Sequence, residues 1–595
     1  MPDLTRTPWA VLVAALLAGC ASAPAPKPAA PPPPAHGDIT ALTVMAEADL
    51  KRGDCRSASE HYARAAASGD VKLARRATQV AMACEHLPAA FQSATRWRTL
   101  APNDREAAAL YAAVALKLYR TDDARAAIRD FWRIEEQQAA TSGAAAGSAP
   151  GAPPQAPAAA SPTARAQDRA TKSMMELSAL LLEESDAPGG APAVLIAMSG
   201  ALEADANTPA TLTLLAELAL AAYDGKRSQQ YAERALQGDP KDLAALRVLA
   251  RAYVMRGDVP QAVAIARREQ ADDATRGGFE LAEILASVDR SEEAHQELEL
   301  LRAGGAPQAE VDRRLALLAF TSGDMKEARQ RFTELLSNGE GNDAAQLYLA
   351  DIAARDGDRD EAIATYRRLY DSSVALPARS RAAALLLDKS ARTEALALLD
   401  DYAADHPEEE LDLTLTKARL LADHGEADTS LALLSAALER HPHHPSIEYD
   451  RAVILEQAGH VNESVQALER LLADRPDDPT LLNALGYTLA DHTLQLQHAE
   501  ALIQQALVVM PDNPAALDSL GWVRFRKGDA QGAAVILARA YSLDHDGEIA
   551  AHWGEALWVS GQQGEARRVW AAALARDPES KALKKTIKRL LPDAQ

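Results

Sequence analysis

Small side chains recur along the chain at a regular interval, and this periodicity dominates the pattern of hydrophobic and polar positions. From residue 228 onward they follow one another at intervals of 32 to 35 residues. The positions are Ser228, Ala262, Ala294, Ala328, Ala362, Ala395, Ser430, Ser464, Ala499, Ala533 and Ala566. A period of this length is typical of repeat proteins, in which each unit buries its hydrophobic face on the next.

Three other residue types keep the same register. Glycine lies five residues before the small residue in seven units, where a turn between helices needs its backbone freedom. Proline lies twelve residues after it in six units, where a helix must stop. A larger apolar side chain lies four residues after it, on the same helix face. The pattern therefore predicts one pair of antiparallel helices per period and an all-α chain.

This pattern resembles the tetratricopeptide repeat (TPR), whose unit is a helix pair of about 34 residues. The resemblance implies a right-handed superhelical solenoid with an extended concave wall, formed mainly by the first helix of each pair. The same register recurs upstream at Ala58, Ala90 and Ala124, and a degenerate unit surrounds Val194, which gives about fifteen repeats. We expect N-terminal repeats over residues 39–136 and a C-terminal solenoid over 169–579.

A flexible insert is predicted between these two parts, over residues 137–168. Residues 137–164 carry no charge and are rich in Ala, Pro and Gly, a composition typical of linkers. The alternative is that the alanine-rich start continues the preceding helix for a turn or two.

Composition and charge narrow the function classes. Aromatic residues make up only 4% of the chain, which argues against an all-β fold. The formal net charge of -22 opposes binding to a phosphate backbone, so nucleic acid is not expected as a partner.

The N-terminus combines an apolar run with a cysteine. Residues 9–19 are apolar and are followed by Cys20. Eleven residues are too few to span a bilayer, but they suit a signal peptide over residues 1–19. The string Leu17-Ala18-Gly19-Cys20 resembles a bacterial lipobox, which implies lipidation of Cys20. Ala21, in place of Asp, then implies an outer-membrane lipoprotein that faces the periplasm. The alternative is a merely hydrophobic N-terminus, because Arg6 is offset by Asp3.

Residues 20–38 are predicted to form a tether after the lipidated cysteine. They contain seven prolines and would reach up to about 55 Å at about 3.1 Å per residue. The globular part would thus be held away from the membrane.

Two further cysteines fall in the first repeats. Cys55 opens the second helix of repeat one, and Cys84 closes the first helix of repeat two. Because these helices are antiparallel neighbours, a disulfide between them is expected in an oxidising compartment. Two independent buried thiols are the alternative.

Recognisable catalytic motifs are missing. His552 and Glu555 lack the second histidine of a zinc protease motif, and Gly225-Lys226-Arg227-Ser228 lacks the pattern of a phosphate-binding loop. The histidine-rich segment 440–445 lies in a turn between repeats, without companion ligands at helical spacing. The sequence therefore predicts no catalytic residue, metal site or cofactor, and a non-enzymatic protein. An enzyme would need groups brought together from several repeats.

The last three repeats suggest a binding groove. Each contains a glycine at the helix crossing, and the residues that share a face with its neighbour should line the concave side. These are Asn483, Tyr487, Asp491, Asp518, Trp522, Arg526, Glu548, Glu555 and Trp558. Rings beside carboxylates and an arginine suit an extended peptide or protein segment. The alternative is that the rings merely pack within a tightly wound superhelix.

These repeats, the lipobox and the proline-rich tether are together similar to the large proteobacterial TPR lipoproteins. That family includes the lipoprotein partner of the periplasmic carboxyl-terminal processing protease. The resemblance implies an adaptor that holds this serine protease and presents cell-wall hydrolases for degradation. Two other function classes stay open: a scaffold for envelope assembly or exopolysaccharide export, and an enzyme.

The segment 580–595 is predicted to be a basic capping helix and tail. It contains Lys581, Lys584, Lys585, Lys588 and Arg589, and a polar cap is what the open end of a solenoid requires. Contact of its basic face with anionic lipid is a second interpretation.

The lipobox predicts that cells fed labelled palmitate incorporate it into the wild-type chain, and that Cys20→Ala abolishes the incorporation. Label present in both chains, or in neither, would contradict lipidation of Cys20. The matched variant Cys84→Ala removes a cysteine outside the lipobox and should leave the label unchanged.

Overall fold

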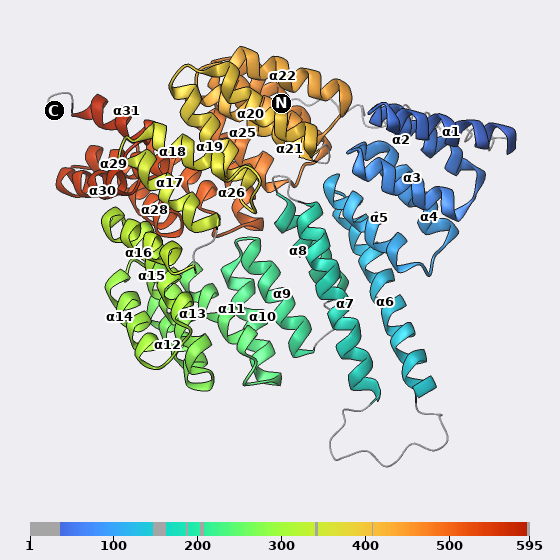
Figure 1. Ribbon diagram of the computed structural model, residues 1–595, viewed down its shortest axis with the longest axis horizontal. Helices are drawn as coiled ribbons and strands as arrows, with labels where there is room; N and C mark the ends of the chain where they lie inside the picture. The colour runs from blue at the N-terminus through green and yellow to red at the C-terminus, as the bar shows by residue number, and fades with distance from the viewer. Residues whose placement is uncertain are drawn as a thin grey trace, which may run out of the picture.

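The computed structural model describes residues 36–146, 162–185, 189–202, 208–339, 343–406 and 409–591, which form 31 α-helices, one 3-10 turn (η1, Ala66–Ser68) and no strand (Figure 1). The predicted all-α fold is confirmed. In chain order the helices are α1 (His36–Lys51), α2 (Cys55–Ala65), α3 (Val71–Ala83), α4 (Leu87–Leu100), α5 (Arg105–Lys117), α6 (Thr121–Ala146), α7 (Pro162–Glu184), α8 (Gly190–Leu202), α9 (Pro209–Ala221), α10 (Gly225–Gly238), α11 (Leu243–Met255), α12 (Val259–Asp272), α13 (Ala274–Ser287), α14 (Ser291–Ala303), α15 (Gln308–Ser322), α16 (Met325–Ser337), α17 (Asp343–Arg355), α18 (Arg359–Arg368), α19 (Ala375–Asp388), α20 (Arg392–Asp405), α21 (Glu410–Asp423), α22 (Ala427–Arg440), α23 (Pro445–Gln457), α24 (Val461–Asp474), α25 (Pro479–Asp491), α26 (Leu496–Val509), α27 (Pro514–Arg526), α28 (Ala530–Leu543), α29 (Gly547–Val559), α30 (Gln563–Arg576) and α31 (Lys581–Leu590).

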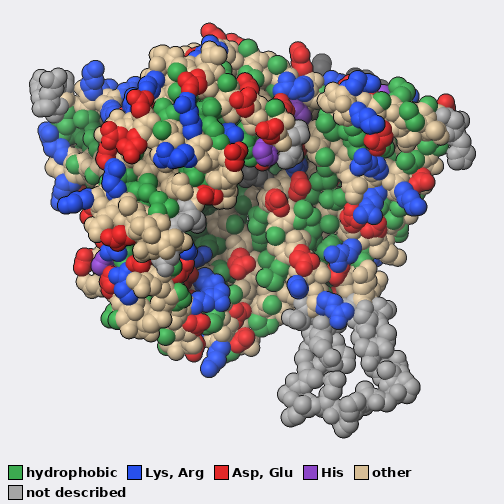
Figure 2. All heavy atoms as spheres, in the orientation of Figure 1, with side chains coloured by type: hydrophobic (Ala, Val, Ile, Leu, Met, Phe, Trp, Pro, Cys, Tyr) green, Lys and Arg blue, Asp and Glu red, His purple; other side chains and the backbone are tan. Residues whose placement is uncertain are grey.

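Helices α1 to α30 follow one another as fifteen pairs that stack into a superhelix, and α31 covers its last pair. Neighbouring helices along the chain pack on one another throughout, with weaker contacts between α7 and α8, between α20 and α21 and between α30 and α31. The molecule is hollowed at the centre of the face shown in Figure 2, where the superhelix wraps around.

The small residues of the repeat lie where helices cross. All eleven members of the series from Ser228 to Ala566 are completely buried. Three glycines allow a still closer approach: a Cβ atom would lie 2.5 Å from Ile503 at Gly486, 2.5 Å from Leu537 at Gly521 and 2.0 Å from the Trp570 ring at Gly554. Atoms this close cannot coexist, so the packing of these pairs depends on the missing side chains.

Aspartate begins many of the helices. Asp54, Asp70, Asp104, Asp242 and Asp546 are among those whose carboxylates accept hydrogen bonds from backbone N–H groups of the first turn. Such N-caps satisfy donors that the helix leaves unpaired and suit the positive end of its dipole. Part of the net negative charge therefore serves helix initiation.

The boundaries at both low-complexity segments need correction. Helix α6 continues ten residues into the predicted insert, and α7 begins at Pro162, so residues 137–146 and 162–168 are helical. The alanine-rich start of the insert favours the helix, and α6 packs against α7 and α8 (Figure 1). Residues 147–161 lie outside the described residues.

The predicted tether over residues 20–38 also ends earlier than expected, because residues 36–38 already belong to α1. The signal peptide, Cys20 and the remainder of the tether lie outside the described residues. Within the described part of the chain, no helix is long and apolar enough to cross a membrane.

The helix crossings generate a stability prediction. Gly554→Ala should lower the free energy of unfolding by about 1–3 kcal/mol, because the new methyl group overlaps the Trp570 ring. Urea unfolding followed by tryptophan fluorescence measures the change.

Gly564→Ala is the matched control, since a Cβ atom at Gly564 meets nothing within 4 Å. That variant should be as stable as the wild type or slightly more stable, because alanine favours the helix. Equal losses in the two variants would contradict close packing as the role of Gly554.

Candidate functional site

A cavity of about 470 Å³ lies at the C-terminal end of the superhelix, between α25, α27, α29 and α31. Its walls combine aromatic rings with charged side chains of both signs. The lining residues are Tyr487, Asp491, Trp522, Phe525, Arg526, Glu548, Ala551, His552, Glu555, Ala582, Lys585, Thr586 and Arg589.

The first helices of three successive pairs place these groups on one surface. Tyr487, Trp522 and Glu555 each follow the crossing glycine of their helix, so they take equivalent positions. Asp491 and Arg526 lie one helical turn further along α25 and α27. The repeat thus stacks equivalent positions side by side along the wall.

Hydrogen bonds and ring stacking fix the aromatic groups. The Trp522 indole Nε1 donates to Asp491 Oδ1 at 2.9 Å. The Tyr487 hydroxyl donates to Glu548 Oε1 at 2.6 Å. The Trp522 ring stacks on His552, with ring centroids 4.0 Å apart, and on Phe525 at 5.1 Å. The rings are held in place before any partner arrives, which lowers the entropy cost of binding.

Two ion pairs support the walls of the cavity. His552 Nδ1 lies 3.0 Å from both carboxylate oxygens of Asp518, and both side chains are buried. Burial alone would lower the pKa of His552, but the negative charges of Asp518, Glu548 and Asp491 outweigh it and raise that pKa above its ordinary value. Glu555, also buried, pairs with Arg589 of α31.

Burial and the carboxylate of Glu548 raise the pKa of the Tyr487 hydroxyl well above its ordinary range. Tyr487 is therefore protonated at neutral pH and remains a donor to Glu548. Neither Glu548 nor Lys585 forms an ion pair with another side chain among the described residues. The cavity thus keeps one carboxylate and one ammonium group available for a bound molecule.

The structure brings together six of the nine predicted groove residues: Tyr487, Asp491, Trp522, Arg526, Glu548 and Glu555. Asp518 lies directly behind the wall, paired with His552.

Asn483 and Trp558 do not line the cavity. Trp558 packs against Trp570 and under Arg567 instead. It lies three residues after Glu555, whereas Asp491 and Arg526 lie four residues after Tyr487 and Trp522. One residue rotates a helix position by about 100°, so Trp558 turns toward α30.

Sequence reasoning missed Phe525, His552 and the whole contribution of α31 to the cavity. A signal for α31 was present, because Arg589 follows Glu555 by 34 residues, one repeat length. The terminal helix occupies the place of a further first helix and presents Lys585, Thr586 and Arg589 to the cavity.

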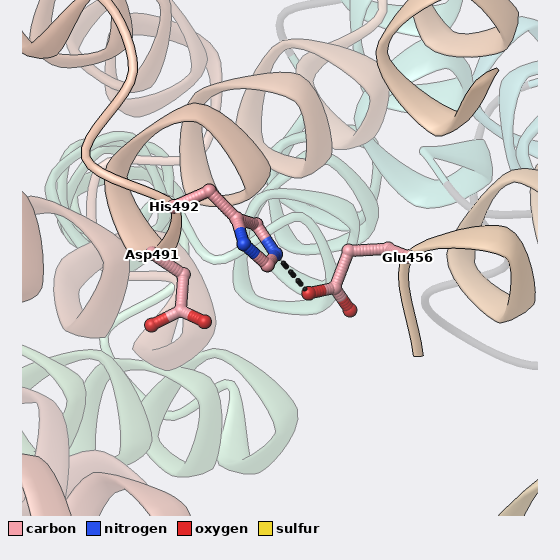
Figure 3. Close-up of side chains that lie close together, drawn as sticks. All are labelled: Glu456, Asp491 and His492. Carbon is pink, nitrogen blue, oxygen red and sulfur yellow. Dashed lines mark hydrogen bonds and ion pairs between the residues drawn. The ribbon is translucent and has the colours of Figure 1, made fainter. Parts of the chain in front are cut away.

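One group of possible metal ligands lies beside the cavity. Glu456, Asp491 and His492 place ligand atoms within 4.8 Å of one another (Figure 3). His492 Nε2 lies 2.6 Å from Glu456 Oε1. The Asp491 carboxylate does not point at Glu456 (Figure 3), and its Oδ1 accepts from Trp522. His492 therefore pairs with Glu456, and Asp491 orients Trp522.

The histidine-rich turn between α22 and α23 disperses its rings to separate carboxylates. His441 lies 3.4 Å from Glu410, His443 lies 3.6 Å from Glu448, and His444 lies 3.4 Å from Glu85. The contact of His444 is with the N-terminal repeats, far away in sequence.

Cys55, at the start of α2, and Cys84, directly after α3, form a disulfide with Cα atoms 5.3 Å apart. The bond joins the first repeat to the second, at the N-terminal end of the superhelix.

Comparison with known proteins identifies TPR repeats in the chain. Two tetratricopeptide repeat models match, one over residues 219–276 and 421–486 and the other over 279–377. The TPR repeat-containing protein PA4667 of Pseudomonas aeruginosa is 32% identical over 213 residues. The match spans 36% of this chain and 36% of that relative.

Two solved structures are also similar. Yeast Tom70 is 13% identical, with 92% of this chain and 99% of that chain covered and a TM-score of 0.33. The thermophilic TPR protein TTC0263 of Thermus thermophilus is 23% identical, with 30% and 97% covered and a TM-score of 0.28.

The His552–Asp518 pair predicts a titration. In NMR spectra of ¹³C-histidine-labelled protein, the pKa of His552 should lie above 6.5. It should fall in Asp518→Asn, because the neutral amide no longer offsets the lowering of the pKa by burial. A raised pKa means that the pairing stabilises the fold fully at low pH and that this stability is lost as the pH rises through the raised value.

Asp529→Asn is the matched control, since Asp529 caps α28 and is not a partner of His552. It should leave the His552 titration unchanged. A wild-type pKa at or below 6.5 would contradict the assignment.

Proposed function

We propose that the chain is a lipid-anchored adaptor of the outer membrane that faces the periplasm and binds a carboxyl-terminal processing protease together with its cell-wall hydrolase substrates. TPR repeats generally act as scaffolds for protein binding, which supports the coarser part of this proposal. The lipobox at Cys20 and the resemblance of residues 480–575 to TPR lipoproteins motivate the location and the partner. The protease would supply the catalysis.

The terminal cavity is the observation that carries the binding role. It offers fixed rings, the Glu548 carboxylate, which accepts from Tyr487 but forms no ion pair among the described residues, and the ammonium group of Lys585. A protein segment with an acidic group and a basic group could pair with both and lay apolar side chains on Trp522 and Phe525. The held rings and the polar rim are typical of recognition sites for protein segments.

A charge reversal at Lys585 tests this role. When a tagged full-length chain is crosslinked in the envelope and recovered, the wild type should bring down a periplasmic serine protease and cell-wall hydrolases. Lys585→Glu should reduce that recovery at least tenfold, because its carboxylate repels the acidic group of the partner and adds to the charge of Glu548.

Lys584→Glu is the matched control. Lys584 is the preceding residue of α31 but pairs with Glu579 and does not line the cavity. Equal recovery with both variants would place binding elsewhere. Recovery of no protease or hydrolase by the wild type would reject the adaptor function itself.

A further inference from the structure

Turns in the first half of the superhelix contact turns in the second half, and we call this line of contacts the seam. On one side are turns within helix pairs, from α1–α2 to α13–α14. On the other side are turns between successive pairs, from α22–α23 to α30–α31, together with the end of α28. The seam joins residues that are 256 to 383 positions apart in sequence.

The N-terminal part of the seam holds the turn between α22 and α23 and the turn between α24 and α25. Arg56 donates to the Glu439 carbonyl oxygen at 3.5 Å, and His444 lies 3.4 Å from Glu85. The Tyr119 hydroxyl donates to the Asp477 carbonyl oxygen at 3.2 Å.

The middle of the seam centres on Asp512, in the turn between α26 and α27. Its backbone N–H donates to the Tyr223 carbonyl oxygen at 2.9 Å, and its carboxylate accepts from the Gly225 N–H at 3.1 Å. Arg539 of α28 lies 3.1 Å from the same carboxylate and donates to the Met255 carbonyl oxygen.

The last contacts of the seam gather on Asp289, in the turn between α13 and α14. His545 Nε2 lies 3.0 Å from Asp289 Oδ2, and Arg576 pairs with Oδ1. Two of these three side chains, His545 and Arg576, are supplied by the C-terminal repeats.

Four of the eight described non-glycine residues with a positive φ make contacts at the seam. Glu85, Tyr119, Tyr223 and Asp289 have φ values between 49° and 61°, a left-handed conformation that disfavours residues other than glycine. They occupy the turn position that glycine takes in many other repeats, including Gly425, Gly459, Gly528 and Gly561. Each of the four makes a seam contact, three through the side chain and Tyr223 through its carbonyl oxygen.

The seam is polar, unlike the contacts inside the stack. Every cluster of buried hydrophobic residues in the described chain stays within neighbouring repeats, and none joins the two sides of the seam. Exposure varies along the seam: the Asp289 side chain is 55% exposed although it binds two partners, whereas Asp512 is 17% and His444 9% exposed. Ion pairs that water can reach contribute little to stability, whereas buried apolar surface contributes most of it.

We propose that the seam opens and closes in the folded protein and thereby controls how a partner segment reaches the inside of the superhelix. The repeats on either side keep their packed cores while the turns separate, because no described cluster of buried hydrophobic residues spans the seam. Control of access rests on the adaptor function proposed above. The opening itself does not, and it is measured on the chain without a partner.

Hydrogen exchange at the backbone amide of Asp512 reports the opening directly, since this N–H donates across the seam. In the wild-type chain we expect this amide to exchange at least a hundredfold faster than the buried amides of α25 and α27. Arg539→Ala removes the contact with the Met255 carbonyl oxygen across the seam and the pairing that holds Asp512 on its own side. It should speed exchange at Asp512 at least a further threefold, with the core amides unchanged.

Arg524→Ala is the matched control. Arg524 pairs with Glu500 of the preceding helix at 2.6 Å, within the stack rather than across the seam. It should leave exchange at Asp512 unchanged.

Three results would overturn the proposal: Asp512 exchanging as slowly as the core, Arg539→Ala having no effect on it, or Arg539→Ala accelerating all amides equally. The last would mean that the seam breaks only when the protein unfolds. Any of them would leave the adaptor function untouched, because no partner takes part in the measurement.

Discussion

The close approach of helices at small residues is the constraint on which the rest of the structure depends. Eleven successive repeats place a completely buried Ala or Ser at the crossing, and the last three add a glycine on the facing helix. Side chains of this size let neighbouring backbones pack closely, so every unit takes nearly the same orientation to the next. The regular stack, the superhelix and the alignment of equivalent positions all follow from this packing.

The terminal cavity is a consequence of the same regularity. Equivalent positions on α25, α27 and α29 supply Tyr487, Trp522 and Glu555, and α31 closes the row with Arg589. Few aromatic residues are present in the chain, and two rings of this row meet His552 in a single network. The buried pair of His552 with Asp518 fixes that network from behind, and the half-exposed pair of Glu555 with Arg589 supports the wall beside it.

The parts of this arrangement that follow from local pattern could be predicted from the sequence. The repeat period, the helix pairs and most of the groove residues depend on spacing along the chain, and spacing fixes the helix face. Trp558 was misplaced because a register shift of one residue turns a side chain by about 100°. The role of α31 in the cavity was missed because its basic residues suggested a polar cap or a contact with anionic lipid.

The seam could not be predicted in this way. Which turns meet depends on the pitch of the superhelix. That pitch results from small rotations between successive repeats, added over the whole stack. The only local sign is the replacement of glycine by Glu85, Tyr119, Tyr223 and Asp289 at turns that require a left-handed backbone, and Ser390 and Thr493 show the same replacement away from the seam. Without the structure, these substitutions are indistinguishable from ordinary variation in a turn.

Photocrosslinking in the intact envelope tests the central claim most directly, namely that the terminal cavity binds a protein partner. A photoreactive phenylalanine analogue would replace Thr586, which lines the cavity, or Val508, which lies on α26 with 77% of its surface exposed and outside the cavity. The account predicts a covalent adduct from position 586, identified by mass spectrometry as a periplasmic serine protease or a cell-wall hydrolase, and none from position 508. An adduct from position 508 alone, or the same adduct from both positions, would contradict it.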